Sequence, residues 1–137
     1  MNEDAPLLVI VDAANVVGSV PDGWWRDRAG ATVRLRDKIA GLSAEGLPGK
    51  DVPAWAEHGP LDVVLIAEGK ARGIGGSDTV TVSDAPGSGD DAIVALVAGQ
   101  AHRNTLVITA DRALRDRVHA LGAHTTGPRC IHRPGGG

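Results

Sequence analysis

Aromatic residues and cysteine are scarce in this sequence of 137 residues, and each absence limits what the protein can be. The sequence has no phenylalanine or tyrosine and only three tryptophans, so valine, leucine, isoleucine and alanine must fill the interior. The single cysteine, Cys130, excludes an internal disulfide and a cysteine-based structural zinc site. A chain without disulfides suits a reducing compartment, and we expect a cytoplasmic protein.

The sequence also lacks a targeting segment, a membrane span and an excess of positive charge. Residues 1–6 have neither the basic start nor the apolar stretch of a signal peptide, and no later run is long enough to cross a bilayer. We therefore expect no membrane partner. The formal net charge is -3, which excludes a globally basic nucleic-acid-binding surface, so RNA contacts must come from local clusters.

The length of the chain fits one domain with a sizeable hydrophobic core. We expect a flexible leader over residues 1–6, the folded domain over residues 7–127 and a C-terminal tail over residues 128–137.

What the sequence does contain is a set of apolar, β-branched runs that each stop at an acid. They are residues 7–12, 61–68, 79–84 and 105–111, which end at Asp12, Glu68, Asp84 and Asp111. Each run predicts a strand, and residues 123–126 predict a short fifth one. If the strands are parallel, their acids lie along one edge of one sheet, where α/β folds bind ligands.

Apolar residues at helical spacing lie between these runs. Three such groups predict helices: Leu35, Ile39 and Leu42; Ile93, Val94 and Val97; and Leu114, Val118 and Leu121. Residues 12–19 predict a turn, and residues 53–58 predict one short helix. Strands that alternate with helices predict an α/β fold, a three-layer sandwich with a mainly parallel sheet whose central strands are residues 7–12 and 105–111.

The acids Asp12, Asp90 and Asp111 would converge at that edge of the sheet. Two carboxylates roughly 6 Å apart repel each other by about 3 kcal/mol at an effective dielectric of ~20. A metal ion therefore holds them, or some are protonated, or they lie further apart. All-oxygen ligands favour Mg²⁺ or Mn²⁺ over zinc, and Glu68 can join the set.

Several of these acids also have a purely structural interpretation. Asp91 with Ser88 resembles a capping box at the start of a helix, and for Asp91 we prefer that role. Asp111 can be a plain helix N-cap, and Glu68 suits the site and the surface equally well. Asp12, directly after a buried central strand, is placed for capping or for metal ligation.

Other polar and aromatic residues near the same edge are candidates for supporting roles. Asn15 can cap the first turn or hold a ligand-facing water, and Thr109 can support the site or only pack in its strand. Five residues are candidates for substrate contacts: Arg112, Lys70, Arg72, Trp24 and Trp25. The basic residues can bind phosphate, and the alternatives for them are surface salt bridges or solubility. The tryptophans can stack on bases, and the alternative for them is to cover the hydrophobic core.

Three segments in order resemble the motifs of the NYN branch of the PIN-like nucleases: residues 12–17, 87–93 and 107–112. The resemblance spans roughly residues 7 to 127. It implies a parallel sheet of strand order 3-2-1-4-5 and metal-dependent cleavage of RNA. Asp12, Asp90 and Asp111 would be its metal-binding acids, with Asn15 and Thr109 as supporting groups.

The sequence differs from the family pattern in two places. Ala13 and Ala14 stand where the family usually has glycine and tyrosine. A further acid usually lies on an intervening helix, and no acid here, among Asp37, Glu45 and Glu57, matches that position well. Glu68 can compensate from the second strand.

The leading functional hypothesis is a hydrolase, an endoribonuclease that cleaves RNA with Mg²⁺ or Mn²⁺ held by Asp12, Asp90 and Asp111. A noncatalytic RNA- or protein-binding module on the same fold is one alternative. A phosphohydrolase of small nucleotides is another, although residues 73–76 lack the features of a phosphate-binding loop. A homodimer is compatible with the sequence, and the sequence does not identify any protein partner.

Overall fold

Five parallel strands form one sheet in the order β3-β2-β1-β4-β5. The strands are β1 (Leu7–Asp12), β2 (Leu61–Ala67), β3 (Val80–Asp84), β4 (Thr105–Ile108) and β5 (His124–Thr126). The computed structural model describes residues 7–18, 23–47, 52–56, 60–100, 103–128 and 131, without the side chains of Trp24, Ser43 and Lys70. The strand order and the expected strands are confirmed.

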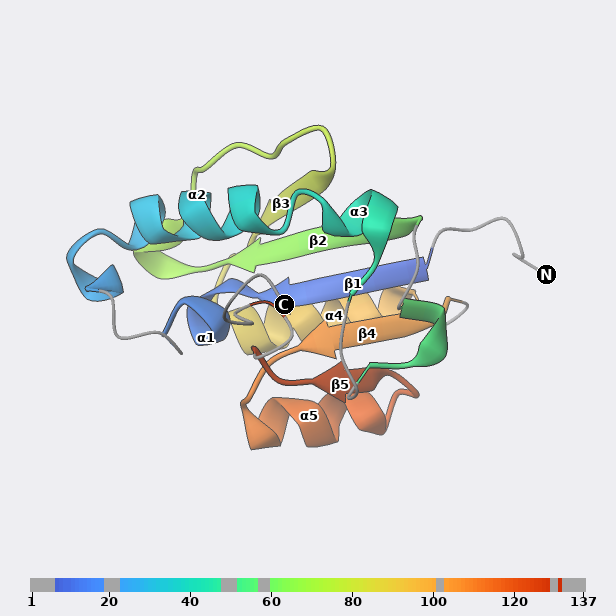
Figure 1. The fold of residues 1–137 in the computed structure, drawn as a ribbon. Helices are drawn as coiled ribbons and strands as arrows, with labels where there is room; N and C mark the ends of the chain where they lie inside the picture. The colour runs from blue at the N-terminus through green and yellow to red at the C-terminus, as the bar shows by residue number, and fades with distance from the viewer. Residues whose placement is uncertain are drawn as a thin grey trace.

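Helices cover both faces of the sheet (Figure 1). They are α1 (Ala13–Gly18), α2 (Arg28–Lys38), α3 (Leu42–Glu45), α4 (Gly89–Gly99) and α5 (Arg112–His119), with 3-10 turns η1 (Trp24–Arg26), η2 (Ala54–Ala56) and η3 (Gly69–Ala71). α2 and α3 pack on one face, and α4 and α5 pack on the other. The three-layer α/β sandwich is therefore confirmed.

Alternation along β1 divides the core between the two faces. Val9 and Val11 pack with α2, whereas Leu8 and Ile10 pack with α4 and α5. All four side chains are buried. Full burial of such a side chain stabilises the fold by about 1.5–3 kcal/mol, so an apolar run without alternating polarity is the sequence of a strand covered on both faces.

The turn predicted over residues 12–19 was wrong in its conformation, because residues Ala13–Gly18 form the short helix α1. The carboxylate of Asp12 accepts a long hydrogen bond, 3.5 Å, from the backbone N–H of Asn15. This contact has the geometry of a helix N-cap, which favours a helical turn directly after the strand.

The helix expected to contain Leu35, Ile39 and Leu42 is two helices. α2 ends at Lys38, the chain turns at Gly41, and Leu42 begins α3 while still packing on the core. Glycine disfavours a continuous helix, which accounts for the break.

Leu121 was also wrongly predicted to lie on the buried face of the third helix. It lies in the turn after α5 and is 41% exposed. The helix ends where Gly122 adopts a φ of +91°, a left-handed conformation that glycine adopts without strain.

Two further observations concern the predicted domain limits and the membrane. Ile131, in the segment expected to be a tail, packs against the core on the α2 side of the sheet. Residues 1–6 lie outside the described part of the chain. No helix in the described part is long and apolar enough to span a bilayer.

All five strands point the same way, so their carboxyl ends meet at one edge of the sheet (Figure 1). Asp12 ends β1, and Glu68 comes directly after β2. The registers of β1 and β4 place Thr109 next to Asp12. Asp90 and Asp111 belong to the starts of α4 and α5, which begin near the same edge.

Candidate functional site at the carboxyl edge of the sheet

Asp12 is the most buried acid of this edge. Its residue is 4% exposed, although it carries an ionisable group. The pKa of Asp12 is raised to about 6. Burial is the largest cause, the hydrogen bonds from Thr109 and Asn15 lower the pKa, and the negative charges of Asp90 and Glu68 add smaller increases. Asp12 is therefore an acid whose charge the surrounding protein does not fully compensate.

Thr109 holds the carboxylate of Asp12 in place. Its hydroxyl donates to Oδ2 of Asp12 over 2.9 Å and accepts the backbone N–H of Asp111 over 3.1 Å. Thr109 is fully buried, and the side chain of Arg115 donates to its carbonyl oxygen. A single hydroxyl thus connects the end of β1 to the start of α5.

Asn15 makes a contact that the sequence did not predict. Its Oδ1 accepts the backbone N–H of Ala110 over 2.7 Å, while its own N–H donates to Asp12. The side chain therefore ties α1 to the loop after β4 instead of capping its own turn. The sequence could not predict this contact, because it joins segments that are 95 residues apart.

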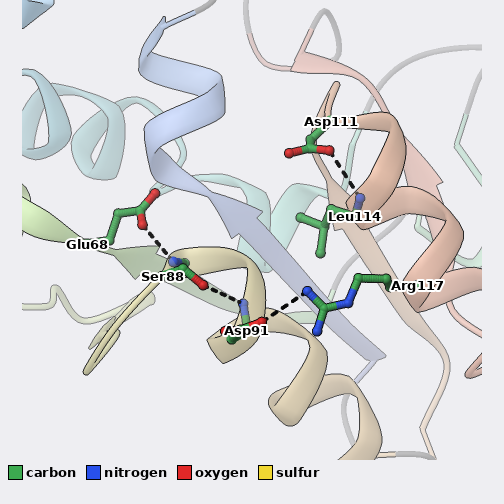
Figure 2. Close-up of polar contacts among 7 residues, drawn as sticks. Glu68, Ser88, Asp91, Asp111, Leu114 and Arg117 are labelled. Carbon is green, nitrogen blue, oxygen red and sulfur yellow. Dashed lines mark hydrogen bonds and ion pairs between the residues drawn. The ribbon is translucent and has the colours of Figure 1, made fainter.

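Glu68 reaches from the end of β2 to the start of α4 (Figure 2). Its Oε2 accepts the backbone N–H of Gly89 over 2.7 Å. A Cβ atom at position 89 would lie 3.2 Å from the Glu68 carboxyl group, so glycine allows the close approach. Sequence reasoning missed Gly89, although a glycine directly before an acid at a helix start is a signal of such an approach.

Asp91 has the structural role that we preferred for it. Its backbone N–H donates to the Oγ of Ser88 over 3.2 Å, which caps α4. Its carboxylate forms an ion pair with Arg117 of α5 over 3.1 Å (Figure 2). Asp91 therefore joins two helices on the outside of the domain.

Asp90, its neighbour in sequence, is half-buried and close to other acids. Burial raises its pKa, and the charges of Asp111 and Glu68 raise it further, while Arg117 lowers it. In the described part of the chain, the carboxylate of Asp90 accepts no hydrogen bond and forms no ion pair. Two consecutive acids of one helix thus have different environments.

Asp111 is the N-cap of α5. Its Oδ1 accepts the backbone N–H of Leu114 over 3.1 Å, as Figure 2 shows. Asp111 therefore has the helix-capping role that was the structural alternative to metal binding. Capping does not remove the charge of the carboxylate, which raises the pKa of Asp90.

The acids at this edge have the type of donor atom that binds a divalent cation. Carboxylate oxygens are the donors that Mg²⁺ and Mn²⁺ prefer, and mutual repulsion contributes to the raised pKa values of Asp12 and Asp90. Their spacing is wider than a ligand shell, because no three acids, histidines or cysteines among the described residues are close enough to hold a metal ion together. Side-chain rotation would have to bring them inward around an ion.

The expected substrate-contacting residues are only partly described. Arg112 is exposed at the start of α5, and Trp25 is 55% exposed on η1. Arg72 is exposed, and its Nε donates to the carbonyl oxygen of Gly69 over 3.2 Å. The side chains of Trp24 and Lys70 lie outside the described part of the structure.

The chain is similar in structure to Rae1 (YacP) from Bacillus subtilis, solved as a W164L mutant. The TM-score is 0.68 and the sequence identity is 17%, over 93% of this chain and 73% of that one. No protein-family model matches the chain, and no curated protein sequence matches it. At this identity the likeness shows a shared fold: a parallel α/β domain, which in this chain carries acids along the carboxyl edge of its sheet.

Proposed function

We propose that this protein is a metal-dependent endoribonuclease whose site is the carboxyl edge of the sheet. The observation that carries the proposal is the group of Asp12, Glu68, Asp90 and Asp111, in which the pKa values of Asp12 and Asp90 are raised by burial and by the other acids. The motif resemblance to NYN nucleases and the fold shared with Rae1 support the same conclusion.

The residues that would hold the ion are Asp12, Asp90 and Asp111, with Glu68 beside them. When bound, Mg²⁺ or Mn²⁺ would neutralise charge on a phosphoryl oxygen and acidify a water molecule. Thr109 and Asn15 would act as positioning residues, because their hydrogen bonds fix Asp12 relative to the start of α5.

The protonation state of Asp12 links the site to pH. With a pKa of about 6, Asp12 is mostly ionised at pH 7 and becomes neutral as the pH falls below 6. A neutral carboxyl group is a poor metal ligand, so we expect cleavage to weaken below this pH.

Cleavage of structured RNA tests the proposal. Wild-type protein is incubated with the RNA in Mg²⁺ or Mn²⁺, with and without EDTA, beside an Asp12→Asn variant. The control variant is Asp62→Asn, because Asp62 lies at the opposite end of the sheet and pairs with Arg103. We expect EDTA and Asp12→Asn to abolish cleavage and Asp62→Asn to retain it; cleavage that ignores EDTA and Asp12→Asn would contradict the proposal.

A noncatalytic RNA-binding module is the second candidate. It is favoured by one observation, that no three candidate ligands in the described residues are at metal-binding spacing. Calorimetric titration with Mn²⁺ separates the two functions. Measurable RNA affinity without Mn²⁺ binding would favour the module, whereas Mn²⁺ binding that Asp12→Asn removes would favour the nuclease.

The glycine-rich segment over residues 73–76 gives no support to the third hypothesis, a small-nucleotide phosphohydrolase. This segment lies between η3 and β3, so it leads into a strand. A phosphate-binding loop of the usual kind leads into the N-terminus of a helix, where backbone N–H groups and the helix dipole attract the anion.

A further inference from the structure

The carbonyl group of Thr109 is buried at the place where β4 stops. The ladder between β4 and β5 pairs Ile108 with Thr126, and one step further the N–H of Thr109 donates to the carbonyl oxygen of Thr126 over 2.9 Å. In a parallel ladder, the carbonyl of Thr109 would then accept the N–H found two residues after Thr126. That residue is Pro128, which has no N–H to donate.

The side chain of Arg115 supplies the donor that the ladder lacks. Its Nε donates to the carbonyl oxygen of Thr109 over 3.0 Å, and no other group in the described part of the chain donates to that oxygen. A Cβ atom at Gly127 would lie 3.7 Å from Nη2 of Arg115, so the guanidinium lies beside the backbone that follows β5. A buried carbonyl without a donor destabilises a fold, so this contact holds the end of β4 in place.

The turn from Thr109 to Asp111 carries three contacts of the acidic edge. The hydroxyl of Thr109 donates to Oδ2 of Asp12 and accepts the N–H of Asp111. Between these two residues, the N–H of Ala110 donates to Oδ1 of Asn15. Any shift of the Thr109 backbone would therefore move the groups that fix Asp12 relative to the start of α5.

We propose that Arg115 is a positioning residue of this edge, which fixes the turn from Thr109 to Asp111 and, through the Thr109 hydroxyl, the carboxylate of Asp12. Arg115 forms no hydrogen bond or ion pair with an acid of the edge in the described part of the chain, so it acts through Thr109. Its effect on RNA cleavage rests on the proposed nuclease function, whereas its effect on the turn does not.

Two substitutions of equal length separate the hydrogen bond from the bulk of the side chain. Arg115→Gln places an amide nitrogen at the position along the side chain where arginine has Nε, so a donor remains. Arg115→Met places a methyl group there, which cannot donate. Arg117→Met is the matched control, because Arg117 lies on the same helix but pairs with Asp91.

Amide hydrogen exchange of the metal-free protein, in EDTA, measures the turn. The reporters are the N–H groups of Ala110 and Asp111, compared with that of Ile10 in β1. We expect Arg115→Met to speed exchange at both reporters by about tenfold or more relative to Ile10, and Arg115→Gln and Arg117→Met to stay within about threefold of wild type. Unchanged exchange in Arg115→Met, an equal change at Ile10, or the same loss in Arg115→Gln would overturn the proposal.

Steady-state cleavage of RNA separates positioning from substrate binding. A residue that orders the site without contacting the substrate should change kcat and leave KM unaffected. We expect Arg115→Met to lower kcat by about tenfold with KM within about twofold of wild type, and Arg115→Gln to stay within about threefold of the wild-type kcat. A higher KM with unchanged kcat would make Arg115 a contact to the RNA and overturn the positioning role.

The failure of this role and of the nuclease function can be told apart. If wild-type protein cleaves RNA, and Arg115→Met has wild-type exchange and wild-type kcat, the positioning role is wrong and the nuclease stands. If no RNA is cleaved, but Arg115→Met loosens the turn and Arg115→Gln does not, the positioning role stands and the nuclease function is wrong.

Discussion

Acids at the two ends of the sheet have opposite electrostatic environments. At the end where the strands begin, Asp62 of β2 forms an ion pair with Arg103, over 3.2 Å. At the end where they stop, Asp12 is buried, and its pKa is raised mainly by that burial and to a smaller extent by the charges of Asp90 and Glu68. An acid that is paired with a cation contributes to the fold, whereas acids that face one another destabilise it, which is the arrangement expected where a ligand is bound.

The same contrast is found within two consecutive residues of α4. Asp91 points to Arg117, and Asp90 is influenced by Asp111 and Glu68. Sequence alone gives these neighbours the same charge and almost the same position. The structure separates them, so they form a matched pair for experiment.

The largest effect is expected from Asp90→Asn. We expect this change to lower RNA cleavage on the order of 100-fold or more, because it removes a charged oxygen ligand of the proposed ion. Asp91→Asn removes an exposed ion pair and should change cleavage by about threefold or less. Steady-state cleavage rates of both variants measure the difference, and equal losses would break the contrast between the two residues.

The second effect concerns stability and pH. The pKa of Asp12 rises from 3.8 to about 6 on folding, so between these pH values the folded protein binds more protons than the unfolded chain. Stability therefore falls as the pH rises from 4 to 6, by about 2 kcal/mol from this group. Asp12→Asn should lack this fall. Urea unfolding at several pH values in EDTA measures it, and parallel profiles for variant and wild type would contradict the expected pKa.

Two threonines at opposite ends of β4 provide the third test. Thr109→Val removes the hydroxyl that contacts both Asp12 and the N–H of Asp111, and we expect a loss of about 1–3 kcal/mol and a higher pKa for Asp12. Thr105→Val removes a hydroxyl that donates to the carbonyl oxygen of Arg103, far from Asp12 along the strand. It should leave the Asp12 pKa unchanged, as measured by NMR; similar shifts in both variants would argue against a specific role for Thr109.

The smallest effect is expected from Asp62→Asn. The Asp62–Arg103 pair lies near the surface, and its loss should destabilise the protein by about 1 kcal/mol or less. Urea unfolding at neutral pH measures this change. A larger loss, or a loss of RNA cleavage, would mean that the opposite end of the sheet contributes to the site.

The fold could be predicted because its strands coincide with continuous apolar runs in the sequence. Val9, Ile10, Val107 and Ile108 are buried, and only a strand covered on both faces requires such a run. The break after Lys38 was missed because the apolar periodicity continues across the turn at Gly41. The exposure of Leu121 was missed because the periodicity continues past His119, where α5 ends.

The candidate site was predictable only in part. Asp12 could be found because it ends a buried strand, and Asp90 because it lies in the first turn of a helix. The contacts of Asn15 and Thr109 depend on two loops that meet in space, and local sequence carries no signal for them.

The most direct test of a cation site at this edge is the pKa of Asp12 with and without Mg²⁺. Carbon-13 NMR of the Asp12 carboxyl group measures it across a pH titration. A pKa of about 6 is expected in EDTA, with a fall of roughly one unit or more in saturating Mg²⁺, because a bound cation stabilises the ionised form. An Asp12 pKa that Mg²⁺ leaves unchanged would contradict a metal site formed by these acids.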